Sequence, residues 1–100
     1  AKRKRDAAAQ AQVQAQAKDL ALYQFHACPF CVKTRRALHR LNVPLELRDA
    51  KHDPQHRQAL LEGGGRVKVP CLRIDEDGRT TWMYESNDII AYLEKRCGAI

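Results

Sequence analysis

A pair of cysteines at the start of a predicted helix is the feature that most restricts what this chain can fold into. Residues 26–33 read HACPFCVK, so that Cys28 and Cys31 stand two positions apart. An apolar run with aromatic residues, 20–25, precedes the pair and is typical of a buried strand. Pro29 suits the first position of a helix, and apolar residues recur after it at helical spacing. The pair is therefore expected where a strand ends and a helix begins.

This placement favours a thiolate at Cys28. The first N–H groups of a helix have no intrahelical partner, and together with the helix dipole they stabilise negative charge. The thiol of Cys31 can also donate a hydrogen bond back to Cys28. A C-x-x-C pair at a helix start lowers the pKa of its first thiol from about 8.5 into a range of roughly 3.5–7.5. Cys31, one turn further along, is expected to stay protonated until it acts as the resolving thiol.

Zinc binding is the main alternative for the cysteine pair. A structural zinc site usually has four ligands, and the sequence contains no second C-x-x-C pair. His52 and His56 have the i, i+4 spacing of two ligands on one helix, which keeps the alternative open. A proline between the first cysteine and a helix is, however, typical of a redox site. The pattern favours redox chemistry and no bound metal.

The remaining chain predicts one α/β domain. One hundred residues suffice for a single hydrophobic core. Apolar periodicity, caps and turn residues predict the order β-α-β-α-β-β-α, in which a helical crossover makes the first two strands parallel. The Asp-Glu-Asp-Gly sequence at 75–78 predicts a hairpin, and Gly63–Gly65 is expected to end the second helix. The expected strands are residues 20–25, 45–48, 69–74 and 80–84, and the expected helices begin near Pro29, Pro54 and Ser86, the last as an N-cap.

The positive charge of the chain lies largely at its N-terminal end. Of the net charge of +6, residues 1–18 carry +4, with five basic side chains and one acidic. Their Ala/Gln-rich part contains a single large apolar residue, Val13, so it has no obvious face to bury. We therefore expect residues 1–18 to form a tail or stalk and residues 19–100 to form the folded domain. Lys2–Arg5 could bring the protein close to anionic lipid, but no nucleic-acid partner is expected.

Two further motifs lie far from the cysteines in the sequence. Val69-Pro70 places a proline at the start of the third strand, where it cannot donate a ladder hydrogen bond. If the peptide bond is cis, the backbone of Val69 is free to pair with an incoming extended peptide. Glu85-Ser86, followed by Asn-Asp-Ile, places a hydroxyl and free N–H groups at a helix start, which suits a carboxylate.

Together these motifs resemble those of the glutaredoxins, which have a thioredoxin-like fold with a four-stranded mixed sheet flanked by helices. The ESNDIIAYL sequence is more similar to the thioredoxin-like domain of glutathione transferases. The resemblance covers Asp19 to about Arg96. It implies that Cys28 is the nucleophile and Cys31 the resolving thiol. It also implies a glutathione site in which Phe30 lines the groove, Val69 binds the cysteinyl backbone beside a cis Pro70, and Glu85 and Ser86 hold the γ-glutamyl end.

The chain departs from the common glutaredoxin pattern at three places. Phe30 replaces a tyrosine, Lys68 replaces a threonine, and Glu85-Ser86 replaces a Gly-Gly pair. The side chain of Lys68, or that of the nearby Arg66, could reach the glycine carboxylate of glutathione. The alternative is that these are solvated loop charges.

The remaining candidate residues have less specific signals. His26 is expected to be a partly exposed loop residue rather than a group that steadies the thiolate. Cys71 is expected to be a small buried apolar residue, with a role as a third redox thiol as the alternative. Cys97 is expected to be exposed.

The predicted function is glutathione-dependent thiol–disulfide exchange. The expected partners are glutathione, as reductant and co-substrate, and disulfide-bonded or glutathionylated proteins, with no tightly bound cofactor. The alternatives are an iron–sulfur carrier that uses Cys28 and glutathione, and a non-catalytic glutathione-binding module. The few, unevenly spaced cysteines favour a reducing cytoplasm over a secreted framework. We expect a monomer, tethered to a membrane only if an anchor precedes residue 1.

Overall fold

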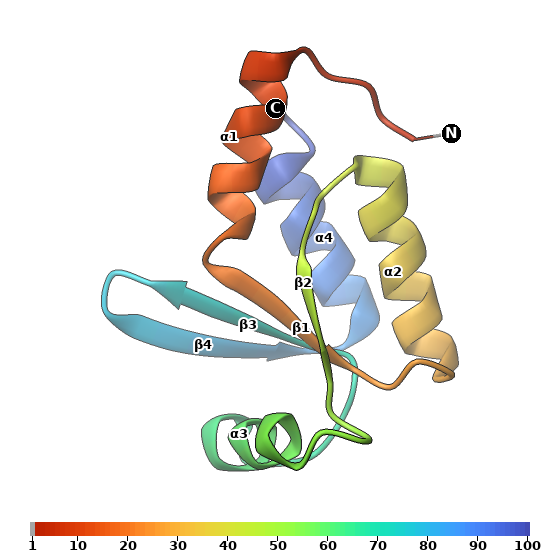
Figure 1. The fold of residues 1–100 in the computed structure, drawn as a ribbon, viewed down its shortest axis with the longest axis vertical. Helices are drawn as coiled ribbons and strands as arrows, with labels where there is room; N and C mark the ends of the chain where they lie inside the picture. Colours follow the sequence, from red (N-terminus) through yellow and green to blue (C-terminus); the bar gives the residue numbers. More distant parts are fainter. Residues whose placement is uncertain (1) are drawn as a thin grey trace.

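A four-stranded mixed sheet lies between two layers of helices (Figure 1). The computed structural model describes residues 2–100. The strand order is β2-β1-β3-β4; β2 is parallel to β1, and β3 is antiparallel to both of its neighbours. From Leu20 onward the element order is the expected one. The elements are α1 (Ala7–Ala17), β1 (Leu20–Gln24), α2 (Pro29–Leu41), β2 (Glu46–Asp49), α3 (Pro54–Gly64), β3 (Cys71–Glu76), β4 (Arg79–Tyr84) and α4 (Ser86–Cys97).

Both faces of the sheet are covered, because α1, α2 and α4 pack on one face and α3 packs on the other (Figure 1). The central strand β1 is accordingly buried along its whole length. Its alternate side chains enter separate cores: Leu22 packs with residues of α2 and α4, and Tyr23 packs beneath α3 with Leu60 and Trp82. A strand covered on both faces reads as a continuous apolar run, which explains the sequence of this segment.

Helix α2 begins directly beyond the strand β1. Cys28 is its N-cap residue and Pro29 occupies its first turn, so the missing N–H of proline costs the helix nothing. The helix ends at Asn42, whose left-handed conformation (φ 54°) allows its N–H to bond to the carbonyl oxygens of Leu38 and His39. The helix thereby holds the cysteine pair at the carboxyl edge of the parallel strands.

The N-terminal segment differs from the expected tail. Residues 7–17 form α1, and Val13 and Ala17 are buried in the core that α2 and α4 share. Arg5 adds polar contacts, donating hydrogen bonds to the carbonyl oxygens of Ile100 (3.0 Å) and Cys97 (3.2 Å) at the end of α4. The expectation that this segment has no face to bury is wrong, because a single valine among alanines is enough where the neighbouring helices approach closely.

Two of the three consecutive glycines lie inside α3. The helix continues through Gly63 and Gly64 and is capped by Gly65, which has a φ of 90°. A Cβ atom at Gly63 would overlap the indole ring of Trp82, and one at Gly64 would overlap the hydroxyl of Tyr84. The helix therefore ends within the expected triplet, at its last two glycines, and Gly63 and Gly64 also admit aromatic side chains of β4.

The turn of the hairpin is shorter than the expected four residues. Strands β3 and β4 pair as far as Glu76 and Arg79, so the turn consists of Asp77 and Gly78 alone, both with positive φ. Such a two-residue turn matches the twist of an antiparallel pair.

None of the helices within residues 2–100 is long and apolar enough to cross a membrane.

Candidate active site

Cys28 is a half-buried thiol at the N-terminus of α2. Burial alone raises its pKa, but the backbone N–H groups of Cys31 and Phe30 donate hydrogen bonds that lower it. The Cys31 thiol and the charge of Arg35 lower it further, and the net result is a pKa below that of an ordinary cysteine. The N-terminal backbone of the helix thus stabilises the thiolate, as the sequence predicts.

Cys31 has the opposite environment. Its side chain is fully buried, and burial, together with its hydrogen bond to Cys28 and the negative charge there, raises its pKa to about 11. The pKa values of the two thiols are therefore shifted in opposite directions, and a hydrogen bond joins the two sulfur atoms. Both thiols are free in this structure.

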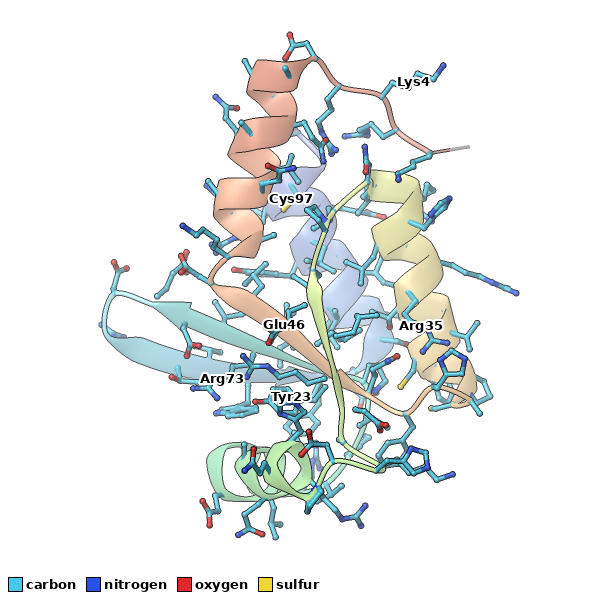
Figure 2. All side chains as sticks on the ribbon, in the orientation of Figure 1. Lys4, Tyr23, Arg35, Glu46, Arg73 and Cys97 are labelled. Atoms are coloured by element: carbon cyan, nitrogen blue, oxygen red, sulfur yellow. The ribbon has the colours of Figure 1, made fainter. Side chains whose placement is uncertain are left out.

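Arg35 is a residue of the site that the sequence analysis missed. It projects from α2 (Figure 2) and donates a 2.7 Å hydrogen bond to the carbonyl oxygen of His26, with a second bond to the side chain of Gln24. It therefore anchors the loop that leads into Cys28 and adds positive charge near both cysteines. Its position seven residues after Cys28, two turns along α2, is the only sequence signal for this role.

A cavity of about 430 Å³ adjoins the helix start that carries the cysteines. Phe30, 62% exposed, stands on one side of it, and the opposite side comes from the segment before β3 and the first turn of α4. The cavity brings together all five residues that the sequence analysis assigned to glutathione. Its lining residues are Phe30, Lys33, Lys68, Val69, Pro70, Glu85, Ser86, Asn87 and Asp88.

The Val69-Pro70 peptide bond is cis, as the sequence analysis considered. Neither the N–H nor the carbonyl oxygen of Val69 has a hydrogen-bond partner within residues 2–100. The backbone of Val69 therefore presents an unused donor and acceptor at the cavity, as an extended peptide would need.

Glu85 adopts an unusual backbone conformation at the start of α4. Its φ of 72° and ψ of 116° are rare for a residue with a side chain, and such conformations concentrate at functional sites. Ser86 is the first residue of the helix and is buried, so the expectation that it is the N-cap is wrong; Glu85 is the N-cap. The bend at Glu85 turns its carboxylate to the surface while the Ser86 side chain stays inside.

Lys68 and Glu85 form an ion pair on the lining of this cavity, with 2.6 Å between Nζ and Oε1. The hydrogen bond and charge of Lys68 lower the pKa of the Glu85 carboxyl. Lys68 therefore lines the cavity, and its contact with the glycine carboxylate of glutathione stays a prediction. Arg66 instead lies over the ring of Tyr84, 4.6 Å from its centroid.

The remaining candidate residues lie elsewhere. His26 is exposed. Cys71 is buried as expected, and burial raises its pKa to about 11. Cys97 is also fully buried, because it lies on α4 beside α1 (Figure 2), so the expectation of an exposed thiol is wrong.

The two histidines considered as zinc ligands pair with acidic side chains and not with the cysteines. His52 pairs with Asp49 at 3.0 Å, and His56 pairs with Asp53 at 3.5 Å. Within residues 2–100 no group of three or more histidine, cysteine or acidic side chains is arranged to hold a metal ion.

The sheet, the dithiol at a helix start and the adjoining cavity define a domain of the thioredoxin-fold class. A family model described as glutathione S-transferase, N-terminal domain, matches residues 22–99. The chain belongs to this family.

Known relatives agree with this assignment. Glutaredoxin 2 of Escherichia coli (strain K12) is 32% identical over 77 residues, which are 77% of this chain and 34% of the relative, and this confirms the resemblance to glutaredoxins. The chain thus spans about a third of that relative's length.

Solved structures show the same fold. A thioredoxin-like protein superposes with a TM-score of 0.61 at 27% identity, covering 81% of this chain and 96% of its own. A maleylacetoacetate isomerase from Anaeromyxobacter dehalogenans, with glutathione bound in its active site, gives 0.60 at 26% identity, covering 79% of this chain and 38% of its own.

Proposed function

We propose that this domain catalyses glutathione-dependent thiol–disulfide exchange, with mixed disulfides between proteins and glutathione as its substrates. The observation that carries the proposal is the pair of opposed thiol environments, with the pKa of Cys28 lowered and that of Cys31 raised to about 11. A thiolate beside a protonated thiol is the arrangement that disulfide exchange needs. The adjoining cavity is lined by the unpaired backbone of Val69 and by charged side chains, and it supplies room for glutathione.

In the first step, the Cys28 thiolate attacks the glutathione sulfur of the mixed disulfide. A new S–S bond forms between Cys28 and glutathione while the bond between glutathione and the protein breaks. The electron pair of the broken bond leaves with the protein sulfur, which takes up a proton and becomes a thiol. The backbone N–H groups of Phe30 and Cys31 stabilise the attacking thiolate before the step and no longer hold a charge after it.

In the second step, a glutathione thiolate attacks the glutathione sulfur that is bound to Cys28. This releases glutathione disulfide and restores the Cys28 thiolate. Alternatively, Cys31 loses its proton and attacks the Cys28 sulfur, which forms a disulfide between the two cysteines and releases glutathione. A thiol whose pKa is about 11 makes this second route slow until its proton is removed.

The cavity residues bind the tripeptide by matching its charges and backbone. Val69 pairs with the cysteinyl backbone, and Glu85 and Ser86 hold the γ-glutamyl end, whose ammonium takes the place of Lys68 at the Glu85 carboxylate. Lys68, released from this ion pair, binds the glycine carboxylate. Lys68 and Glu85 thereby lose each other as partners, and each gains an oppositely charged group of glutathione.

Replacement of Cys28 by serine tests this function. Because a serine hydroxyl remains protonated and is a weak nucleophile, Cys28→Ser should abolish glutathione-coupled reduction of a glutathionylated peptide. Cys31→Ser should retain the route that uses glutathione alone, and Cys97→Ser, on the far end of α4, serves as the control. Full activity of the Cys28→Ser variant would overturn the proposal.

A further inference from the structure

A second cavity adjoins the one proposed for glutathione. It has a volume of about 410 Å³ and lies between α2 and α4, which run side by side from the same end of the molecule (Figure 1). Pro29, Val32 and Ile90 give it an apolar floor. Lys33 and Asn87 line both cavities, and their side chains are joined by a 2.5 Å hydrogen bond. A ligand that extends beyond the glutathione cavity would therefore enter this groove directly.

The rim of the groove is cationic. Lys33, Arg36 and Arg40 line it, and its lining includes no carboxylate. Arg40 is paired with Glu94 at 3.0 Å, and within residues 2–100 the Lys33 ammonium donates its one hydrogen bond to the neutral amide of Asn87. The Arg36 guanidinium is exposed and has no hydrogen-bond or ion-pair partner within residues 2–100. The groove thus offers positive charge that the described protein does not neutralise.

This charge is unfavourable for the helix itself. Helix α2 contains no acidic residue, and neither Lys33 nor Arg36 lies in its last turn, where the helix dipole would favour a cation. Arg36 also stands three residues from Lys33 and four from Arg40, spacings at which like charges repel. Because helix stability does not account for these cations, an external anionic partner is the better explanation.

We infer that the groove between α2 and α4 binds an acidic segment of the protein whose mixed disulfide is reduced. With glutathione in the first cavity, the disulfide lies beside Cys28, and the protein chain attached to its other sulfur passes Pro29 into the groove. Apolar side chains of that segment contact Val32 and Ile90, and its carboxylates pair with Arg36 and Lys33. The inference rests on the proposed function, since it assigns a preference among the substrates of that reaction.

Two glutathionylated peptides test this inference. They share a central cysteine and a leucine, and their flanking residues are either glutamate and aspartate or serine and glycine. We expect the wild-type protein to turn over the acidic peptide with a kcat/KM about two- to five-fold higher, as one or two exposed ion pairs would give. Arg36→Gln should remove most of this preference, leave the serine–glycine peptide unaffected, and make the acidic peptide less sensitive to salt.

A matched variant separates the groove from the overall charge. Arg57 is an exposed arginine on α3, across the sheet from the groove, so Arg57→Gln changes the net charge equally. If both variants reduce the preference to the same extent, or if the wild-type protein shows none, the inference is wrong while the proposed function stands. If neither peptide is reduced by the wild-type protein, the proposed function itself fails.

Discussion

At the scale of single residues, the site depends on two thiols that differ only in their surroundings. Cys28 and Cys31 stand one helical turn apart, yet the backbone N–H groups reach the first sulfur, and the second is fully buried. The two thiols of one C-x-x-C motif therefore have pKa values that are shifted in opposite directions. Arg35 fixes the loop before Cys28, and its charge lowers the pKa of both thiols.

The hydrogen bond from Cys31 predicts a graded effect on its neighbour. Cys31→Ala removes the donor and should raise the pKa of Cys28, whereas Cys31→Ser keeps a hydroxyl donor and should raise it less. The rate of iodoacetamide alkylation of Cys28 against pH measures both. Thermal unfolding of each variant checks that the loss of a buried sulfur has not disrupted α2. If the Cys28 pKa in both variants equalled that of the wild-type protein, the Cys31 side chain would not contribute.

At the scale of elements, α2 and α4 place the chemistry by where they begin. Both start at the same end of the molecule, so Phe30, which lies between the two cysteines, lines one cavity with Glu85 and Ser86 although they are more than fifty residues apart in sequence (Figure 1). Helix α1 contributes differently, since it covers the opposite ends of these two helices through Val13 and the contacts of Arg5.

A substitution in α1 tests whether this helix stabilises the domain. Val13 is fully buried, so Val13→Ala should lower the free energy of unfolding by about 1–3 kcal/mol. Chemical denaturation of the purified domain measures the change. Gln12→Ala, on the exposed side of the same helix, is the control and should leave stability nearly unchanged. A neutral Val13→Ala variant would mean that residues 7–17 form a solvated stalk in solution.

At the scale of the whole molecule, the sequence predicts local features well. It predicts poorly which residues from distant parts of the chain come into contact. Cys28, Cys31 and the element order follow from motifs and periodicity within short stretches. The roles of Arg35 and of the Lys33–Asn87 hydrogen bond do not follow from such patterns, because they arise only when α2 packs against β1 and α4. The burial of Val13 was missed for the same reason, as it depends on helices distant in sequence.

The positions of the glycines illustrate the same limit. Gly63 and Gly64 looked like a helix end because glycine is a poor helix former. They also admit Trp82 and Tyr84 of β4, and that contact is invisible until the sheet is assembled.

The central claim, that the folded protein holds Cys28 as a thiolate, is tested most directly by titrating its thiolate absorbance near 240 nm. The titration would use Cys31→Ser, Cys71→Ala, Cys97→Ser protein, folded and again in denaturant. We expect the folded midpoint to lie below the unfolded one. Because a lowered folded pKa stabilises the folded state above the unfolded pKa, that contribution should disappear as pH falls through the folded midpoint. A folded midpoint equal to or above that of the denatured protein would contradict the account.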